Sequence, residues 1–202
     1  MQNIIIKSWK NRTLNQYVLE HDGSLTLFAL FSLGVVAALL HEHLVKGLSL
    51  PGHHGLEWMA LLLFGRMQSQ DRWAGLMVAS GAATTCMLYS LSLPMTESVK
   101  PALVYLMNGI CVDLMISRVP VKWPLMFRGI MLGGLTFMLK PLALLPFAVL
   151  LDVVIGSFVK HGYIYPVMTH FMFGSIGATV GIALATRINK AEHEQSGKHP
   201  SS

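Results

Sequence analysis

Six apolar segments, separated by short polar stretches, constrain the fold of this chain more than any other feature of its sequence. They cover residues 24–44, 55–67, 73–93, 101–117, 125–159 and 163–187. A helix needs roughly 20 residues to cross about 30 Å of hydrocarbon. Only 12% of the 202 residues are charged, against about 25% in soluble domains. We therefore expect an all-α membrane protein whose solvent is the lipid bilayer.

The second segment, residues 55–67, is short for a crossing, so the number of spans depends on where the basic residues fall. With six spans and both termini in the cytoplasm, the outer side holds three basic residues, which are Lys46, Lys100 and Lys160. The inner side holds eleven, which are Lys7, Lys10, Arg12, Arg66, Arg72, Arg118, Lys122, Arg128, Arg187, Lys190 and Lys198. Cytoplasmic loops carry an excess of Lys and Arg. We therefore predict six transmembrane helices in the inner (cytoplasmic) membrane.

The chain is expected to divide into three parts. Residues 1–23 form a cytoplasmic interfacial segment, residues 24–187 a single transmembrane domain, and residues 188–202 a disordered cytoplasmic tail. We expect the fifth helix to be kinked at Lys140-Pro141, because proline removes a backbone hydrogen bond. The basic residues are scattered rather than clustered, so the net charge of +5 does not indicate nucleic-acid binding.

Polar residues on four different segments reach a similar depth in the outer third of the membrane. Counted at about 1.5 Å of rise per residue, they are Tyr89, Asn108, Lys140 and His170. Asp152 is expected at the outer rim, Glu57 opens the second helix on the same side, and the loop 41–58 lies above. Ionisable groups inside a membrane usually have a function. We predict an outward-facing substrate-binding pocket, unless each residue is separately satisfied by a helix–helix hydrogen bond.

The loop "HEHLVKGLSLPGHHGLEW", residues 41 to 58, holds four of the nine histidines. His53 and His54 precede Glu57 by four and three residues, which places an imidazole and the carboxylate on one face if the helix starts near residue 52. His41 and His43 are further candidate ligands across the loop. Imidazole and carboxylate suit zinc, nickel, cobalt and copper. The alternative is a set of interfacial histidines in a wet loop, since no HExxH or CxxC motif is present.

Enzymatic chemistry finds little support in the sequence. Ser80 and His170 would be the pair for an intramembrane hydrolase, but Ser80 lies near the inner face and His170 near the outer one. A nucleophile and its base must lie within hydrogen-bond reach. His41 and His170 are a candidate pair for haem ligation, although the second interior pair of a transmembrane electron carrier is missing. We expect a protein that is not an enzyme.

Small residues repeat at helical spacing in several segments. They are Gly34 and Ala38, Ala79 and Ala83, Gly129, Gly133 and Gly134, and Gly174, Gly177, Gly181 and Ala185. Such faces let helix backbones approach closely in lipid. They serve either packing within the chain or docking of a partner membrane protein.

The six helices, the chain length and the capped outward pocket resemble the substrate-binding S components of energy-coupling-factor transporters. The stretch "LLLFGRMQSQDRWAGLMVASGAATTCMLYSLSLP", residues 61 to 94, is similar to their second and third helices, with a Gly-Arg turn and a Gly/Ala-rich helix. The resemblance implies a vitamin-like, corrinoid or metal-related substrate, and a coupling subunit with an ATPase as partners. It also implies that Ala29, Gly34 and Ala38 dock the coupling subunit. The start "MQNIII" lacks the Met-His of the metal-specific branch.

The lead hypothesis is therefore a substrate-binding or transport protein for a small molecule. The chain carries no P-loop, so energy for transport must come from a partner or an ion gradient. Two alternatives stay open. One is a structural or assembly subunit of a larger membrane complex, with the small-residue faces as permanent contacts. The other is a metal- or haem-binding redox subunit.

Overall fold

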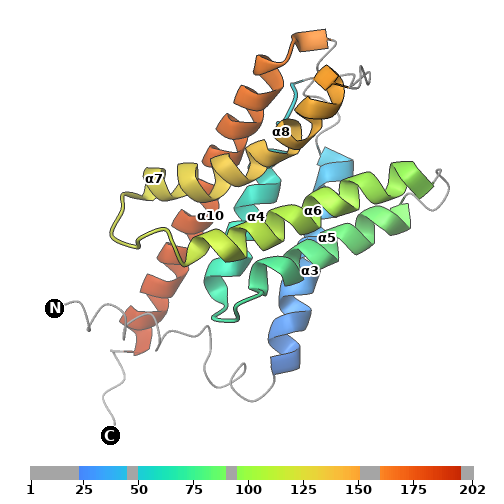
Figure 1. Cartoon of the computed structure of the whole chain (residues 1–202). Helices are drawn as coiled ribbons and strands as arrows, with labels where there is room; N and C mark the ends of the chain where they lie inside the picture. The colour runs from blue at the N-terminus through green and yellow to red at the C-terminus, as the bar shows by residue number, and fades with distance from the viewer. Residues whose placement is uncertain (1–22, 45–49, 90–94, 151–159, 197–202) are drawn as a thin grey trace, which may run out of the picture.

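The computed structural model describes residues 23–44, 50–89, 95–150 and 160–196, which are helical with short turns and contain no strand (Figure 1). The elements are α3 (Gly23–Leu44), α4 (Gly55–Gln68), α5 (Ala74–Tyr89), α6 (Met95–Ile116), α7 (Leu125–Gly129), the π-helical turn η1 (Ile130–Gly134), α8 (Leu135–Leu150) and α10 (Ile164–Ser196). Three helical stretches are long and apolar enough to cross a membrane: Gly23–His41, Leu125–Leu142 and Ile164–Ala191. The described residues are thus all helical, and these three stretches support a membrane protein.

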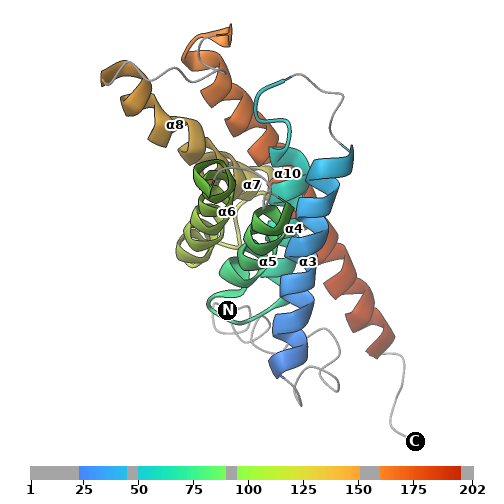
Figure 2. The same cartoon turned by 90° about the vertical axis from the view of Figure 1, so that its right-hand side faces the viewer.

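The helices form one bundle in which α10 packs against α4, η1 and α8, while α3 packs against α5 and α5 against α6. The start of α3 and the end of α10 lie at one end of the bundle, and the end of α8 and the start of α10 lie at the other (Figures 1 and 2). Helix α4 has 14 residues, or about 21 Å of rise. As the sequence predicts, the second of the six apolar segments forms the shortest helical segment among them.

Apolar side chains cover one face of the long helix α10. Exposed hydrophobic residues follow each other at the spacing of one helical turn: Ile164, Met168, Met172, Ile176, Val180, Leu184 and Ile188. A continuous apolar stripe of this length is unusual on a soluble monomer. It fits a helix whose outer face contacts lipid.

The small-residue faces pack within the chain. A Cβ atom added at Gly34 would lie 1.8 Å from the Val78 carbonyl oxygen on α5, and one added at Gly177 would lie 2.3 Å from the Leu56 carbonyl oxygen on α4. These contacts bring helix backbones together, as small residues do in membranes. Gly34 and Ala38 are buried in the bundle, whereas Ala29 is exposed. The three residues therefore do not present one common face for a coupling subunit.

The fifth helical segment stays helical through Lys140 and Pro141. Its departure from α-helical hydrogen bonding is η1, which lies earlier along the chain. Two glycines of η1 press against α10: a Cβ at Gly133 would lie 2.2 Å from the Gly174 carbonyl oxygen, and one at Gly134 would lie 2.3 Å from the Ser175 hydroxyl. The irregular turn thus lies where this segment packs closely against α10.

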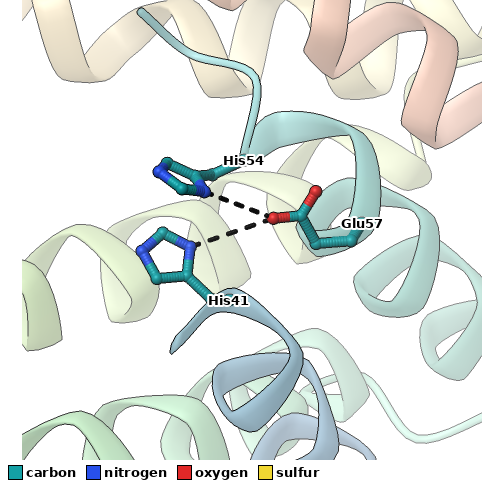
Figure 3. Close-up of side chains that lie close together, drawn as sticks. All are labelled: His41, His54 and Glu57. Carbon is teal, nitrogen blue, oxygen red and sulfur yellow. Dashed lines mark ion pairs between the residues drawn. The ribbon is translucent and has the colours of Figure 1, made fainter. Parts of the chain in front are cut away.

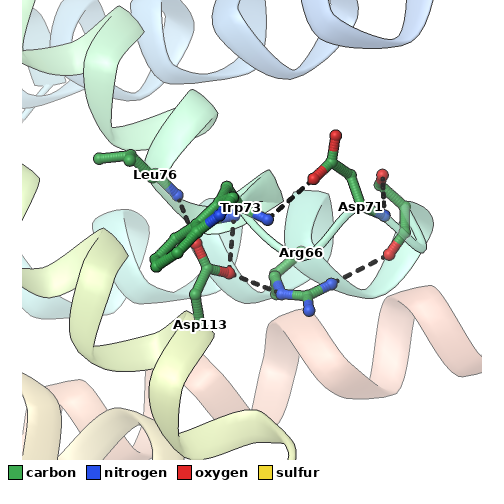
Figure 4. Close-up of polar contacts among 7 residues, drawn as sticks. Arg66, Asp71, Trp73, Leu76 and Asp113 are labelled. Carbon is green, nitrogen blue, oxygen red and sulfur yellow. Dashed lines mark hydrogen bonds and ion pairs between the residues drawn. The ribbon is translucent and has the colours of Figure 1, made fainter. Parts of the chain in front are cut away.

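Asp113 fastens three helices together at the end of the bundle where α4 and α6 terminate (Figure 4). Its carboxylate lies 2.7 Å from Arg66 Nε and accepts hydrogen bonds from the backbone N–H groups of Gly75 and Leu76 at the start of α5. Arg118 is the basic residue nearest to Asp113 in the sequence, about one turn further along. In the structure, Arg118 donates instead to the Leu114 carbonyl within its own chain segment.

Candidate functional site

A partly open cavity of about 370 Å³ lies at the end of the bundle where α3 ends and α4, α6 and α10 begin. Its lining residues are His41, Pro51, Gly52, His54, Trp58, Pro101, Val104, Tyr105, Asn108, Phe137, Lys140, Pro141 and His170. Three residues predicted to bind substrate, Asn108, Lys140 and His170, therefore line one cavity although they come from α6, α8 and α10.

Asn108 presents a completely buried amide to the cavity. Neither its oxygen nor its nitrogen has a hydrogen-bond partner among the described residues, and the same holds for the buried indole Nε1 of Trp58. A buried polar group left unpaired costs about 1–3 kcal/mol. Two donor groups, the Asn108 amide NH2 and the Trp58 indole N–H, therefore remain available to a molecule in the cavity, together with one acceptor, the Asn108 amide oxygen.

His170 is held in place by two contacts. Its Nδ1 lies 2.6 Å from the carbonyl oxygen of Pro166, and its ring stacks on Phe137 with centroids 5.0 Å apart and planes 25° apart. Because a carbonyl oxygen only accepts hydrogen bonds, Nδ1 carries the proton and Nε2 is left as an acceptor. The aromatic pair forms a rigid wall of the cavity.

Lys140 gives the cavity its charge. Among the described residues that line the cavity, it is the only Lys or Arg, and none is Asp or Glu. A charge in a membrane protein is usually paired with an opposite charge or with backbone carbonyl groups. An ammonium group in a cavity whose described lining residues include no carboxylate therefore favours a ligand that carries an anionic group.

Residues 50–54 form a turn that covers His170, and we call them the capping turn. The backbone N–H of His53 lies 3.5 Å from the Leu50 carbonyl oxygen, and Gly52 between them has φ +79°. Proline followed by a glycine with positive φ is the signature of a type II turn. A Cβ at Gly52 would lie 2.7 Å from His170 Nδ1, so only glycine fits this contact.

A second cluster borders the cavity, formed by His41, His54 and Glu57 (Figure 3). Glu57 Oε1 lies 3.4 Å from His54 Nδ1 and 3.9 Å from His41 Nδ1. All three atoms are buried and have no hydrogen-bond partner among the described residues. The imidazole rings of His41 and His54 are 3.8 Å apart, measured between centroids.

The sequence chose His53 rather than His41 as the companion of His54 and Glu57. Helix α4 begins only at Gly55, so His53 lies in the capping turn and the helical spacing to Glu57 does not apply to it. Its Nδ1 contacts the Leu50 carbonyl oxygen instead. His41 reaches the cluster from the last turns of α3.

Other residues singled out in the sequence lie elsewhere. Tyr89, at the end of α5, is about half exposed and is not among the residues lining the cavity. Asp152 lies outside the described residues, and so does the side chain of His43. Ser80 donates its hydroxyl hydrogen to the Leu76 carbonyl within α5.

The aromatic walls of the cavity were not predicted from the sequence, because the prediction rested on polar residues. Trp58 and Tyr105 meet edge to face with centroids 4.6 Å apart. A helical signal was present for Tyr105, which lies three residues before Asn108 and so on the same face of α6.

No family model matches the chain, and no curated protein or solved structure matches it. The resemblance to S components therefore stays a prediction, supported by the predicted topology and by residues 61–94.

Proposed function

We propose that the chain is a multi-pass inner-membrane protein that binds a small molecule in the cavity described above and takes part in its uptake. The observation that carries this proposal is the amide of Asn108. Buried polar groups in native proteins are almost always hydrogen-bonded, yet this one faces a cavity with both polar atoms unpaired. A bound ligand with a matching donor and acceptor gives the amide its partners.

The proposed orientation places the cavity toward the outside. Basic residues gather at the opposite end of the bundle: Arg66 near the end of α4, Arg72 before α5, Arg118 after α6 and Arg187 in the last part of α10. An excess of Lys and Arg is typical of the cytoplasmic side. The start of α3 and the end of α10 then both lie on the cytoplasmic side, as six crossings require.

The chemistry of the lining narrows the ligand. A volume of about 370 Å³ lies near the lower end of the range for small-molecule pockets, about 300–1,000 Å³. This size suits a vitamin-like compound and is too small for a corrinoid macrocycle. Trp58, Tyr105 and Phe137 offer surfaces for a flat ring, and Lys140 favours an anionic substituent. We therefore propose a small cyclic organic anion with a hydrogen-bonding edge that pairs with Asn108.

Transport needs a source of energy, and the resemblance to S components assigns it to a coupling subunit with an ATPase. This chain would bind the substrate and the partners would move it. The alternative of a structural subunit loses its main support, because the small residues Gly34, Gly177 and Gly181 contact helices of this same chain.

The test is mass spectrometry of small molecules retained by the protein purified in lipid nanodiscs. We expect the wild type to retain one compound, and Asn108→Leu and Lys140→Met each to lose it. Lys160→Met is the matched control, because Lys160 is exposed and lies outside the cavity lining. Equal thermal unfolding midpoints show that the variants are folded. Full retention by both folded cavity variants refutes the proposal.

A further inference from the structure

Three potential metal ligands converge where α3 ends and α4 begins. They are one imidazole nitrogen each from His41 and His54 and a carboxylate oxygen of Glu57, and they lie within 4.8 Å of one another. His41 lies near the end of α3, whereas His54 lies in the capping turn and Glu57 in the first turn of α4. Folding therefore brings the three side chains together (Figure 3). The Nδ1 atoms of both histidines and Glu57 Oε1 have no hydrogen-bond partner among the described residues, although all three are buried.

The spacing of these atoms matches a tetrahedral metal site. Zinc binds imidazole nitrogen and carboxylate oxygen at about 2.0–2.2 Å, which places neighbouring ligands of a tetrahedron about 3.3–3.5 Å apart. The distance from Glu57 Oε1 to His54 Nδ1 is 3.4 Å, and that to His41 Nδ1 is 3.9 Å. His41 Nδ1 has to approach Glu57 Oε1 by about half an ångström, and the ligand atoms of the two histidines, which lie within 4.8 Å of each other, have to close to the same spacing.

We infer that His41, His54 and Glu57 bind one divalent transition-metal ion of the zinc type. Imidazole and carboxylate donors suit zinc, cobalt, nickel and copper better than the hard ions magnesium and calcium, which prefer all-oxygen sites. Three protein ligands leave a fourth position for water or another donor. Because His41 and His54 also line the cavity, that position borders the space proposed for the organic ligand.

This site goes beyond the proposed function, because the three side chains bind the ion whether or not an organic molecule occupies the cavity. The competing explanation is a shared proton, with a protonated histidine paired to Glu57. Near pH 7.5, above the ordinary imidazole pKa of about 6.5, fewer protons compete for the ligands and a metal site gains affinity, whereas a cluster that only shares a proton binds no ion.

The experiment uses the full chain in nanodiscs, purified without a polyhistidine tag and freed of metal with a chelator. Zn²⁺ binding is measured by calorimetry, and Co²⁺ is added as a spectroscopic probe at about pH 7.5. We expect one equivalent of either ion and the visible absorption bands of tetrahedral cobalt. His41→Gln and Glu57→Gln are each expected to weaken binding at least tenfold.

The matched control is His53→Gln, which removes a neighbouring imidazole that lies outside the cluster and should leave metal affinity unchanged. Asn108→Leu should likewise bind the ion normally, although it loses the organic ligand, so the two proposals fail separately. The inference is overturned if the folded wild type binds no Zn²⁺. It is also overturned if folded Glu57→Gln and His41→Gln bind the ion as tightly as the wild type does.

Discussion

Replacement of Gly52 by alanine tests how the capping turn is held over the cavity. The residue has φ +79°, and an L-residue in this left-handed conformation costs about 1–2 kcal/mol. The added Cβ would also lie 2.7 Å from Nδ1 and 2.9 Å from Cα of His170. Forcing a methyl group into a packed site costs about 1–3 kcal/mol. The closed turn should therefore be destabilised by about 2–5 kcal/mol in total.

The chain offers a control that separates these two costs. Gly162 has a similar φ of +71°, but a Cβ there meets no atom within 4 Å. Gly162→Ala therefore carries the conformational cost without the clash. The two variants should differ by about 1–3 kcal/mol in the free energy of the closed capping turn. If only the closed turn binds ligand, this difference corresponds to roughly a 5- to 150-fold loss of ligand affinity.

The assay combines ligand retention in nanodiscs with the thermal unfolding midpoint of each variant. Because the capping turn can move away locally, we expect Gly52→Ala to lose ligand more than it loses global stability. His170→Ala removes two of the three atoms nearest to the added methyl group, so the clash should shrink in the double variant. The reasoning is refuted if Gly52→Ala and Gly162→Ala retain equal amounts of ligand.

Two further predictions concern stability and the indole donor. Asp113→Ala leaves the mostly buried Arg66 without its carboxylate and should lower the free energy of unfolding by about 3–5 kcal/mol, which is read as a lower unfolding midpoint. Asp71→Asn, at an exposed position, should change the free energy of unfolding by less than about 0.5 kcal/mol. Equal midpoints for the two variants would contradict the role of the ion pair. Trp58→Phe keeps an aromatic ring against Tyr105 but removes the unpaired Nε1–H. We therefore expect an unchanged unfolding midpoint and reduced ligand retention. Full retention would show that the indole N–H does not bind the ligand.

Depth along a helix was enough to predict that Asn108, Lys140 and His170 share one region. A helix rises about 1.5 Å per residue, and helices that cross one bilayer run in roughly the same direction. The number of residues from the end of a helix therefore gives the depth of a side chain in the membrane. Tyr89 shows the limit of this method. Height says nothing about the direction in which a side chain points, and Tyr89 lies on the exposed side of α5. Rotation about the helix axis depends on packing, which only the structure provides.

Partners were harder to predict than positions. For Asp113, a short-range rule would select Arg118, one turn away, but the bundle brings Arg66 closer from a distant segment. For Glu57, the spacing rule offered His53, yet the rule assumes a helix that has already begun, and α4 begins at Gly55. In both cases a short-range rule was applied where a tertiary contact decides. His41 belongs to the same class, since nothing local links it to Glu57.

The capping turn connects the two proposed sites through adjacent residues. Gly52 contacts His170 on one side of the cavity, and His54, two positions later, contacts Glu57 in the metal cluster. A metal ion held by His41, His54 and Glu57 would tie the end of α3 to the start of α4 and thereby fix the turn over His170. Any free energy that the ion contributes to the closed turn must, by linkage, also favour a ligand that binds beneath it. Under the two proposals, residues 41, 50–54 and 57 would therefore act together, with an ion on one side and an organic ligand on the other.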